Sequence, residues 1–110
     1  VDSTGCVLSI ISGKNEIPNK FTISQNFPNP FNPVTTITFD VPFVDDISLV
    51  VYDLTGKEVA TLAKGTFTPG TYSVEWAAVN NEGDGIVSGM YIYRFTNSKN
   101  THTRKMLFLK

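Results

Sequence analysis

Hydrophobic and polar residues alternate along most of the chain from Phe21 onward. In "TTITFDV", Ile37, Phe39 and Val41 alternate with polar neighbours, which is the period of two expected of a β-strand with one buried face. The same period recurs in "DISLVVYD" and "TYSVEW", and "FTIS", "KEVATL", "MYIYRFTN" and "TRKMLFLK" are further strand-like runs. No apolar period of 3.6 residues persists long enough to indicate a helix. The pattern therefore predicts an all-β protein.

Turn-forming residues separate these runs at short intervals. Pro42 ends one predicted strand, and Thr55-Gly56 predicts the turn of a β-hairpin. Pro69-Gly70 predicts a second turn, and "SKN" joins the last two strands. Such spacing favours an immunoglobulin-like antiparallel β-sandwich of about seven strands.

Residues 1–20 have a different composition, with turn-forming and polar residues around one short apolar run, "CVLSII". We interpret residues 1–20 as a linker or the tail of a preceding domain, and residues 21–110 as the sandwich domain. The run "CVLSII" is either the last strand of that preceding domain or an added strand of the sandwich. The stretch "SGKNEIPNK" predicts accessible backbone that a protease cuts between Ser12 and Lys20. Cys6, the only cysteine, is interpreted as a bystander thiol.

Composition narrows the function classes. The chain has 110 residues, of which 41% are hydrophobic and 17% charged, so a core needs neither disulfide nor metal. A formal net charge of -1 argues against a general nucleic-acid binder, and no apolar run is long enough to span a membrane. From Gly85 to Lys110 there is no acidic residue, so this part is locally basic, either as a solvated sheet edge or as a binding surface. Its basic residues are Arg94, Lys99, Arg104, Lys105 and Lys110.

The inventory of catalytic side chains is poor, and we predict no enzyme, no cofactor and no metal. His102 in "NTHTRK" has no acidic neighbour in sequence, which favours a surface histidine over a member of a catalytic triad. The loop "NNEGDG" offers oxygen atoms at Asn80, Glu82 and Asp84, but Tyr91 stands where an EF-hand places its bidentate glutamate. We therefore expect a hairpin turn from Asn80 to Gly85 rather than a calcium site.

Four aromatic residues offer an alternative function. Trp76, Tyr72, Tyr91 and Tyr93 could form an exposed platform for sugar rings, as in an accessory carbohydrate-binding or adhesion module. On alternating strands, however, aromatic side chains mostly pack in the core, which is the interpretation we favour for Trp76.

The stretch "SQNFPNPFNP", residues 24–33, combines three prolines and three asparagines with two phenylalanines. The prolines fix φ, and Asn26, Asn29 and Asn32 can bond their own backbone in Asx-turns. We predict a stiff crossover between two strands, with Phe27 and Phe31 both tucked under the sandwich.

Several motifs together resemble one family. "FTISQNFPNPFNPVTTITFDV", "LVVYDLTGKEVATL", "PGTYSVEW", "SGMYIYRF" and "TRKMLFLK" follow, in order, the pattern of the C-terminal sorting domain of proteins exported by the type IX secretion system. This Por secretion tail domain is related to the immunoglobulin-like module of flagellar hook-capping proteins. The resemblance implies a non-catalytic signal domain that docks with the outer-membrane secretion machinery and carries an upstream cargo domain to the medium or cell surface.

The resemblance and the basic tail together give the expected recognition site. We expect the secretion machinery to contact the final segment: Lys105, Met106, Leu107, Phe108, Leu109 and Lys110. Removing Met106 to Lys110 is expected to block export and to leave folding intact. The expected protein is a monomer without nucleic-acid partner or membrane insertion. The alternatives are the carbohydrate-binding or adhesion module and an assembly module like that of the hook cap.

Overall fold

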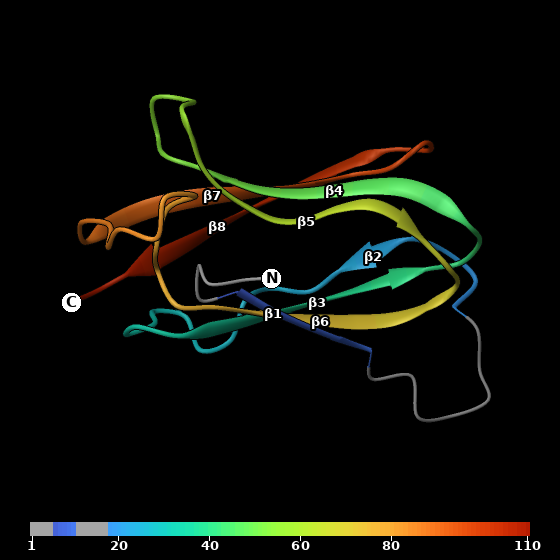
Figure 1. Cartoon of the computed structure of the whole chain (residues 1–110), viewed down its shortest axis with the longest axis horizontal. Helices are drawn as coiled ribbons and strands as arrows, with labels where there is room; N and C mark the ends of the chain where they lie inside the picture. Colours follow the sequence, from blue (N-terminus) through green and yellow to red (C-terminus); the bar gives the residue numbers. More distant parts are fainter. Residues whose placement is uncertain (1–5, 11–17) are drawn as a thin grey trace.

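Two antiparallel four-stranded sheets face each other in the computed structural model, which describes residues 6–10 and 18–110 (Figure 1). One sheet has the order β1-β6-β3-β2 and the other the order β5-β4-β7-β8. The strands are β1 (Cys6–Ile10), β2 (Thr22–Ile23), β3 (Thr35–Val41), β4 (Asp45–Tyr52), β5 (Glu58–Phe67), β6 (Gly70–Trp76), β7 (Gly89–Thr96) and β8 (Thr101–Phe108). The predicted all-β antiparallel sandwich is confirmed, and β1 is a strand beyond the seven expected runs.

The alternation in sequence becomes the alternation of burial. In β3, Ile37, Phe39 and Val41 are fully buried, and the residues between them are half-buried on the outer face. β6 and β7 follow the same rule, so inward residues from both sheets form one core. Because a shift of one residue would turn each strand inside out, this pattern fixes the register of the sheets.

The predicted hairpin between β4 and β5 is present, and one aspartate organises its turn. Oδ1 of Asp53 accepts hydrogen bonds from the backbone N–H groups of Thr55 and Lys57, at 2.9 and 3.1 Å. Gly56 follows with φ of 90°, a conformation that glycine adopts without the strain a side chain would cause. The sequence "DLTGK" therefore specifies this turn by itself.

β1 extends the first sheet. Its backbone pairs antiparallel with β6, with Cys6 opposite Trp76 and Ile10 opposite Tyr72. Of the two alternatives for "CVLSII", the structure shows the strand added to the sandwich. Residues 1–5 and 11–17 lie outside the described residues, as do the side chains of β1. The protease site between Ser12 and Lys20, the domain boundary after Lys20 and the interpretation of Cys6 stay predictions.

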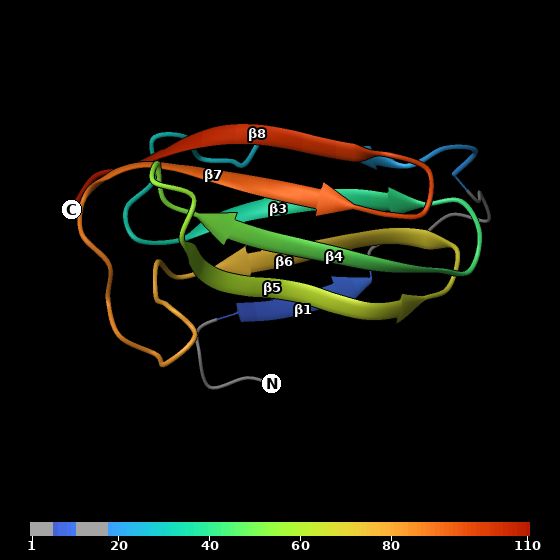
Figure 2. The same cartoon turned by 90° about the horizontal axis from the view of Figure 1, so that it is seen from above.

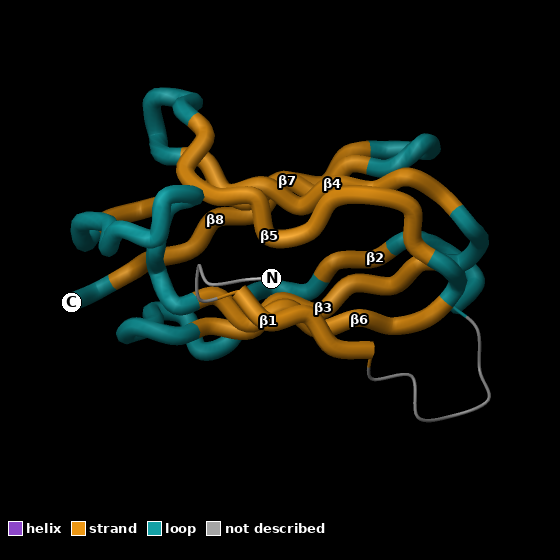
Figure 3. Tube along the Cα trace, in the orientation of Figure 1, coloured by secondary structure: helices purple, strands orange, loops and turns teal. Residues whose placement is uncertain are grey.

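The loops gather at the two ends of the sandwich (Figure 3). One end, near the C-terminus, holds residues 24–34, the β4–β5 hairpin and the long loop 77–88 (Figure 1). The opposite end holds the turns 42–44 and 97–100. Seen from above, β8 and β2 lie along one flank, and β5 and β1 along the other (Figure 2). No helix in the described part of the chain is long and apolar enough to cross a membrane.

Candidate functional site

The expected recognition segment lies at the edge of a sheet and divides into inward and outward residues. β8 is the last strand in its sheet order and pairs with β7. Met106 and Phe108 are 1% and 3% exposed, so their side chains belong to the core. Leu107 is half-buried, whereas Lys105, Leu109 and Lys110 are exposed. A partner can therefore contact only part of this segment through side chains.

The proline-rich stretch, residues 24–33, binds the outer edge of β8, and we call it the proline strap. Phe31 donates its N–H to the Leu107 carbonyl at 3.0 Å and accepts the Leu109 N–H at 3.1 Å. Oδ1 of Asn29 accepts the Leu107 N–H at 2.9 Å, and Nε2 of Gln25 donates to the Lys105 carbonyl at 2.7 Å. The backbone edge from Lys105 to Leu109 is thus occupied by the chain itself and cannot receive an added strand.

A buried network anchors the strap. The Asn26 side chain donates to the Pro28 carbonyl at 3.1 Å and to Oγ1 of Thr35 at 2.9 Å. The Tyr93 hydroxyl accepts the Asn26 N–H at 2.8 Å and donates to the Ser24 carbonyl at 2.7 Å. Burial raises the pKa of Tyr93 to about 12, because the ionised ring would lose its hydration. Asn26 bonds the backbone two residues on as a donor; the predicted Asx-turn, in which its side-chain oxygen would accept an N–H from residue 28, does not form because Pro28 has no N–H.

Asn29 does not form the predicted Asx-turn either. Its side-chain oxygen bonds Leu107 across the molecule rather than its own backbone. An asparagine amide satisfies whichever N–H the fold brings near, and here the strap carries Asn29 to the edge of β8.

The two phenylalanines of the strap have different environments, although both were expected to be buried. Phe31 is 2% exposed and packs against Phe108 and Trp76, with ring centroids 5.1 and 5.9 Å apart. Phe27 is 79% exposed, so the prediction was wrong for this residue. Phe27 forms a two-bond backbone bridge with Thr36, an outer-face residue of β3. Paired residues point to the same face of a sheet, and the Phe27 ring therefore points outward.

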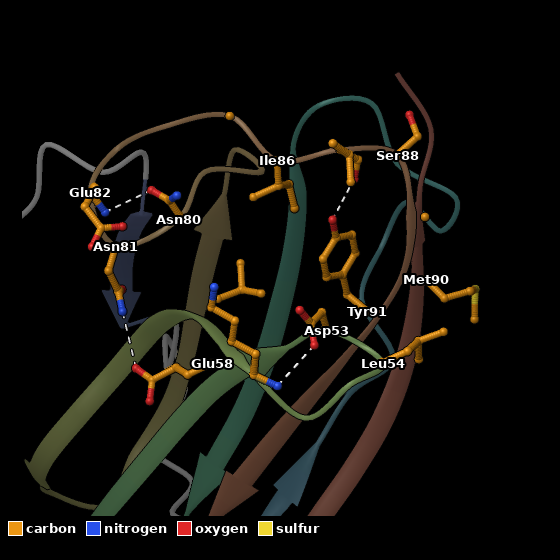
Figure 4. A pocket seen from close by; sticks show the side chains of 15 residues that line it. Asp53, Leu54, Glu58, Asn80, Asn81, Glu82, Ile86, Ser88, Met90 and Tyr91 are labelled. Carbon is orange, nitrogen blue, oxygen red and sulfur yellow. Dashed lines mark hydrogen bonds between the residues drawn. The ribbon is translucent and has the colours of Figure 1, made fainter.

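Next to the C-terminal segment lies a hollow of about 660 Å³ between the β4–β5 hairpin, the loop 77–88 and the start of β7 (Figure 4). Three exposed apolar side chains, Leu54, Val87 and Met90, line it. Met90 lies opposite Leu107 in the sheet, and Oγ of Ser88 accepts the Lys110 N–H at 2.9 Å. Exposed Leu109, which precedes Lys110, therefore lies beside this hollow. We call Leu54, Val87, Met90 and Leu109 the end patch.

The rim of the hollow carries acidic groups and one lysine. Asp53, Glu58, Glu82 and Lys57 lie there. The Thr55 hydroxyl, which donates to Asp53 at 2.6 Å, is the main reason that the pKa of this carboxyl lies below its ordinary value. The buried hydroxyl of Tyr91 donates to the Val87 carbonyl at 2.7 Å, and burial raises the pKa of Tyr91 (Figure 4). The hollow is thus a mixed surface in which a hydrogen-bonded tyrosine forms the floor.

The loop that resembled half of a calcium site forms the expected turn. Oδ1 of Asn80 accepts the backbone N–H groups of Glu82 and Asp84, both at 2.9 Å, and the Asn80 N–H bonds the Asp84 carbonyl at 2.8 Å. Within residues 6–10 and 18–110, no group of three His, Cys, Asp or Glu side chains could hold a metal ion. The Asn80 oxygen is used to close the loop.

The aromatic residues considered for sugar binding are in the core. Trp76, Tyr72, Tyr91 and Tyr93 are each buried. The Trp76 indole donates to the Val79 carbonyl at 2.9 Å, and the Tyr72 hydroxyl donates to the Thr68 carbonyl at 2.8 Å. These rings form no exposed platform, as the core interpretation of Trp76 predicted.

His102 is the second correction, because it was expected at the surface. It lies on the inward side of β8, opposite Phe95, is half-buried and stacks on that ring with centroids 6.4 Å apart. Its Nε2 atom is buried and has no hydrogen-bond partner among the described residues. His102 shares its face of β8 with the buried Met106 and Phe108. This position on the strand, and not the polar residues next to His102 in sequence, determines where the ring lies.

Comparison with known proteins places the chain in context. The model of the family described as "Secretion system C-terminal sorting domain" matches residues 25–109. A search of curated proteins found no match.

Two solved structures from Porphyromonas gingivalis share the fold. The chain is similar to part of dimeric latent PorU, at 19% identity and a TM-score of 0.63, over 94% of this chain and 9% of that one. It is also similar to part of PorZ, described as an essential bacterial surface component of the type-IX secretion system, at 21% identity and a TM-score of 0.55, over 90% of this chain and 13% of that one. The chain spans only a small part of either protein, and both likenesses show the fold alone.

Proposed function

The chain belongs to the family of secretion system C-terminal sorting domains, and we propose that it directs an attached upstream cargo protein across the outer membrane by the type IX secretion system. The observation that carries this proposal is the match over residues 25–109, which begins in the proline strap and ends at Leu109. Membership implies a non-catalytic signal domain and a secreted or cell-surface cargo. The domain itself acts as a monomeric docking unit for the secretion machinery.

The end of the sandwich that carries the C-terminal segment is the surface we assign to docking. Here the strap and the end patch lie beside the exposed Lys110, and Lys105 is exposed farther along β8. Exposed apolar side chains beside charged ones are typical of protein-binding surfaces. The docking partner therefore contacts side chains at this end and not the backbone edge of β8 that the strap already occupies.

The export experiment uses a folded reporter fused upstream of the full chain. In a host with an active type IX system, the fusion is expected in the medium or on the cell surface, and the reporter alone in the periplasm. The same fusion in a host that lacks the translocon is the matched control and is expected to stay periplasmic. Export of the fusion from that host, or its retention in the competent host, would contradict the proposal.

Deletion of Met106 to Lys110 would not separate an effect on recognition from an effect on folding. The deletion removes the core side chains of Met106 and Phe108 and leaves the Phe31 ring without its stacking partner. We therefore expect the deletion to destabilise the fold, which corrects the sequence-based expectation that folding stays intact. Substitution of exposed residues separates recognition from folding.

A further inference from the structure

A second hollow lies at the opposite end of the sandwich, where β2 and β8 face each other across the flank. It has a volume of about 470 Å³. Its walls come from residues 19–23, the turn after β3 and the start of β8. We call it the cationic groove, since its charged and titratable lining residues are Lys20, Lys99, His102 and Arg104. Among the described residues, no carboxylate lines it.

Arg104 is held in place without an acidic partner among residues 6–10 and 18–110. Its Nε donates to the Ile23 carbonyl of β2 at 3.1 Å, which fixes the guanidinium against the wall of the groove. Within the described part of the chain, its two terminal nitrogens have no hydrogen-bond acceptor. A guanidinium presents paired donors that fit a phosphate or carboxylate, so this group is oriented to receive an anion.

The other cations are also oriented by neighbours that leave their charge available. Nζ of Lys99 lies 5.9 Å from the centre of the Phe43 ring, a cation–π contact that keeps the ammonium over the groove wall. The Asp45 carboxylate accepts hydrogen bonds from the backbone N–H and the hydroxyl of Ser98, and Lys99 adds a weaker electrostatic attraction. Asp40 lies opposite Thr22 in the sheet, and its carboxylate accepts hydrogen bonds from the hydroxyls of Thr22 and Thr71.

His102 is the remaining titratable residue of the cationic groove. Its ring lines the groove, and its Nε2 is buried without a partner among the described residues. Protein atoms cover this nitrogen, so a ligand in the groove would meet the imidazole ring and not Nε2.

From this arrangement we propose that the cationic groove binds a phosphate group. Lys20, Lys99 and Arg104 give three permanent positive charges, and the described lining residues include no carboxylate, which favours a dianionic phosphate over a monoanionic carboxylate. Phe21 and Phe43, whose rings are 5.3 Å apart, form an apolar wall for the group that carries the phosphate. This site is at the other end of the domain from the end patch and does not depend on the proposed export function.

The binding experiment follows the amide resonances of the full chain by nuclear magnetic resonance during titration with inorganic phosphate at constant ionic strength. Saturable shifts are expected at residues 20–23 and 99–104. Arg104→Gln is expected to weaken binding by about tenfold, since a charge-assisted pair of hydrogen bonds is lost. Arg94→Gln is the matched control, because Arg94 is exposed on the same sheet and stacks on Tyr52 away from the groove. Its affinity should equal that of the wild type.

Three further comparisons decide the ligand and its source. Acetate at the same ionic strength should give no saturable shifts, and equal binding of acetate would overturn the preference for phosphate. Vesicles that contain phosphatidic acid show whether the phosphate is a lipid headgroup: capture that Arg104→Gln abolishes assigns a lipid source, and absence of capture assigns a soluble one. Linear shifts without saturation, or equal phosphate affinity of Arg104→Gln and Arg94→Gln, would overturn the site.

Discussion

The two halves of β8 protect the same sheet edge in different ways. From Lys105 to Leu109, the outer backbone groups are bonded by the proline strap. From Thr101 to Arg104, the outward backbone groups have no partner within the described part of the chain, and the side chains there include His102 and Arg104. The edge at residues 105–109 is thus bonded by the strap, whereas the edge at residues 101–104 is unpaired and carries the positive charge of Arg104.

This difference shows how an edge strand can be both stable and recognisable. Unpaired strand edges invite uncontrolled pairing, and natural proteins block them with charged residues or with covering segments. Here the covering segment also delivers Phe31 to the core, so the strap closes the sandwich and the edge together. The remaining exposed features at the two ends of β8 are side chains: an apolar patch near the C-terminus and a group of cations near the β7–β8 turn.

Removing the Phe31 ring is expected to have the largest effect on the half of β8 that the proline strap covers. Phe31→Ala is expected to lower the free energy of unfolding by about 3 to 5 kcal/mol, because a buried aromatic side chain is lost and a cavity is left between Trp76 and Phe108. Phe27→Ala is the matched control from the same strap, and its ring is exposed. Urea denaturation measures both. A similar loss for the two variants would show that the burial of Phe31 does not hold the strap.

Alkaline pH should weaken the anchor of the strap. The folded state holds the Tyr93 proton more tightly than the unfolded chain, with a pKa of about 12 against an ordinary value of 10.0. The stability that comes from neutral Tyr93 is therefore complete below pH 10.0 and is lost as the pH rises toward about 12. Denaturation at a series of pH values should show this fall, and Tyr93→Phe should reduce it. The loss of stability that remains in Tyr93→Phe comes from Tyr91, because burial also raises the pKa of Tyr91. An equal fall in Tyr93→Phe would mean that Tyr93 is not the group responsible.

A smaller and more local effect is expected at Asn29. Its side-chain oxygen accepts the Leu107 N–H, so Asn29→Ala should cost about 1 kcal/mol and speed exchange of that amide hydrogen. In the wild type, hydrogen exchange should be slow at Leu107 and Leu109 and fast at Thr103, whose N–H faces away from β7. Equal exchange rates at Leu107 and Thr103 would remove the distinction between the two halves of β8.

The sequence predicted the strands well because burial on a strand follows a local period of two, as Ile37, Phe39 and Val41 show. The proline strap was recognised as a crossover, but its contacts with Leu107 join residues far apart in the chain, and no local pattern encodes such a pairing. Phe27 and Phe31 have the same flanking residue types and differ in burial, since the backbone partner of each decides where its ring points. His102 was misplaced for a different reason, because a strict period of two through Met106 and Phe108 places it inward and that period was not applied.

The most direct measurement of the central claim is export of the reporter fusion when single exposed apolar residues become charged at either end of the sandwich. Leu109→Asp and Leu54→Asp alter the end patch, and Val44→Asp is the matched control at the opposite end, where Val44 is also exposed. Melting curves confirm beforehand that the three variants fold equally well. The account predicts that the two end-patch variants keep the reporter in the periplasm and that Val44→Asp is exported like the wild type. Normal export of both end-patch variants, or loss of export in Val44→Asp alone, would contradict it.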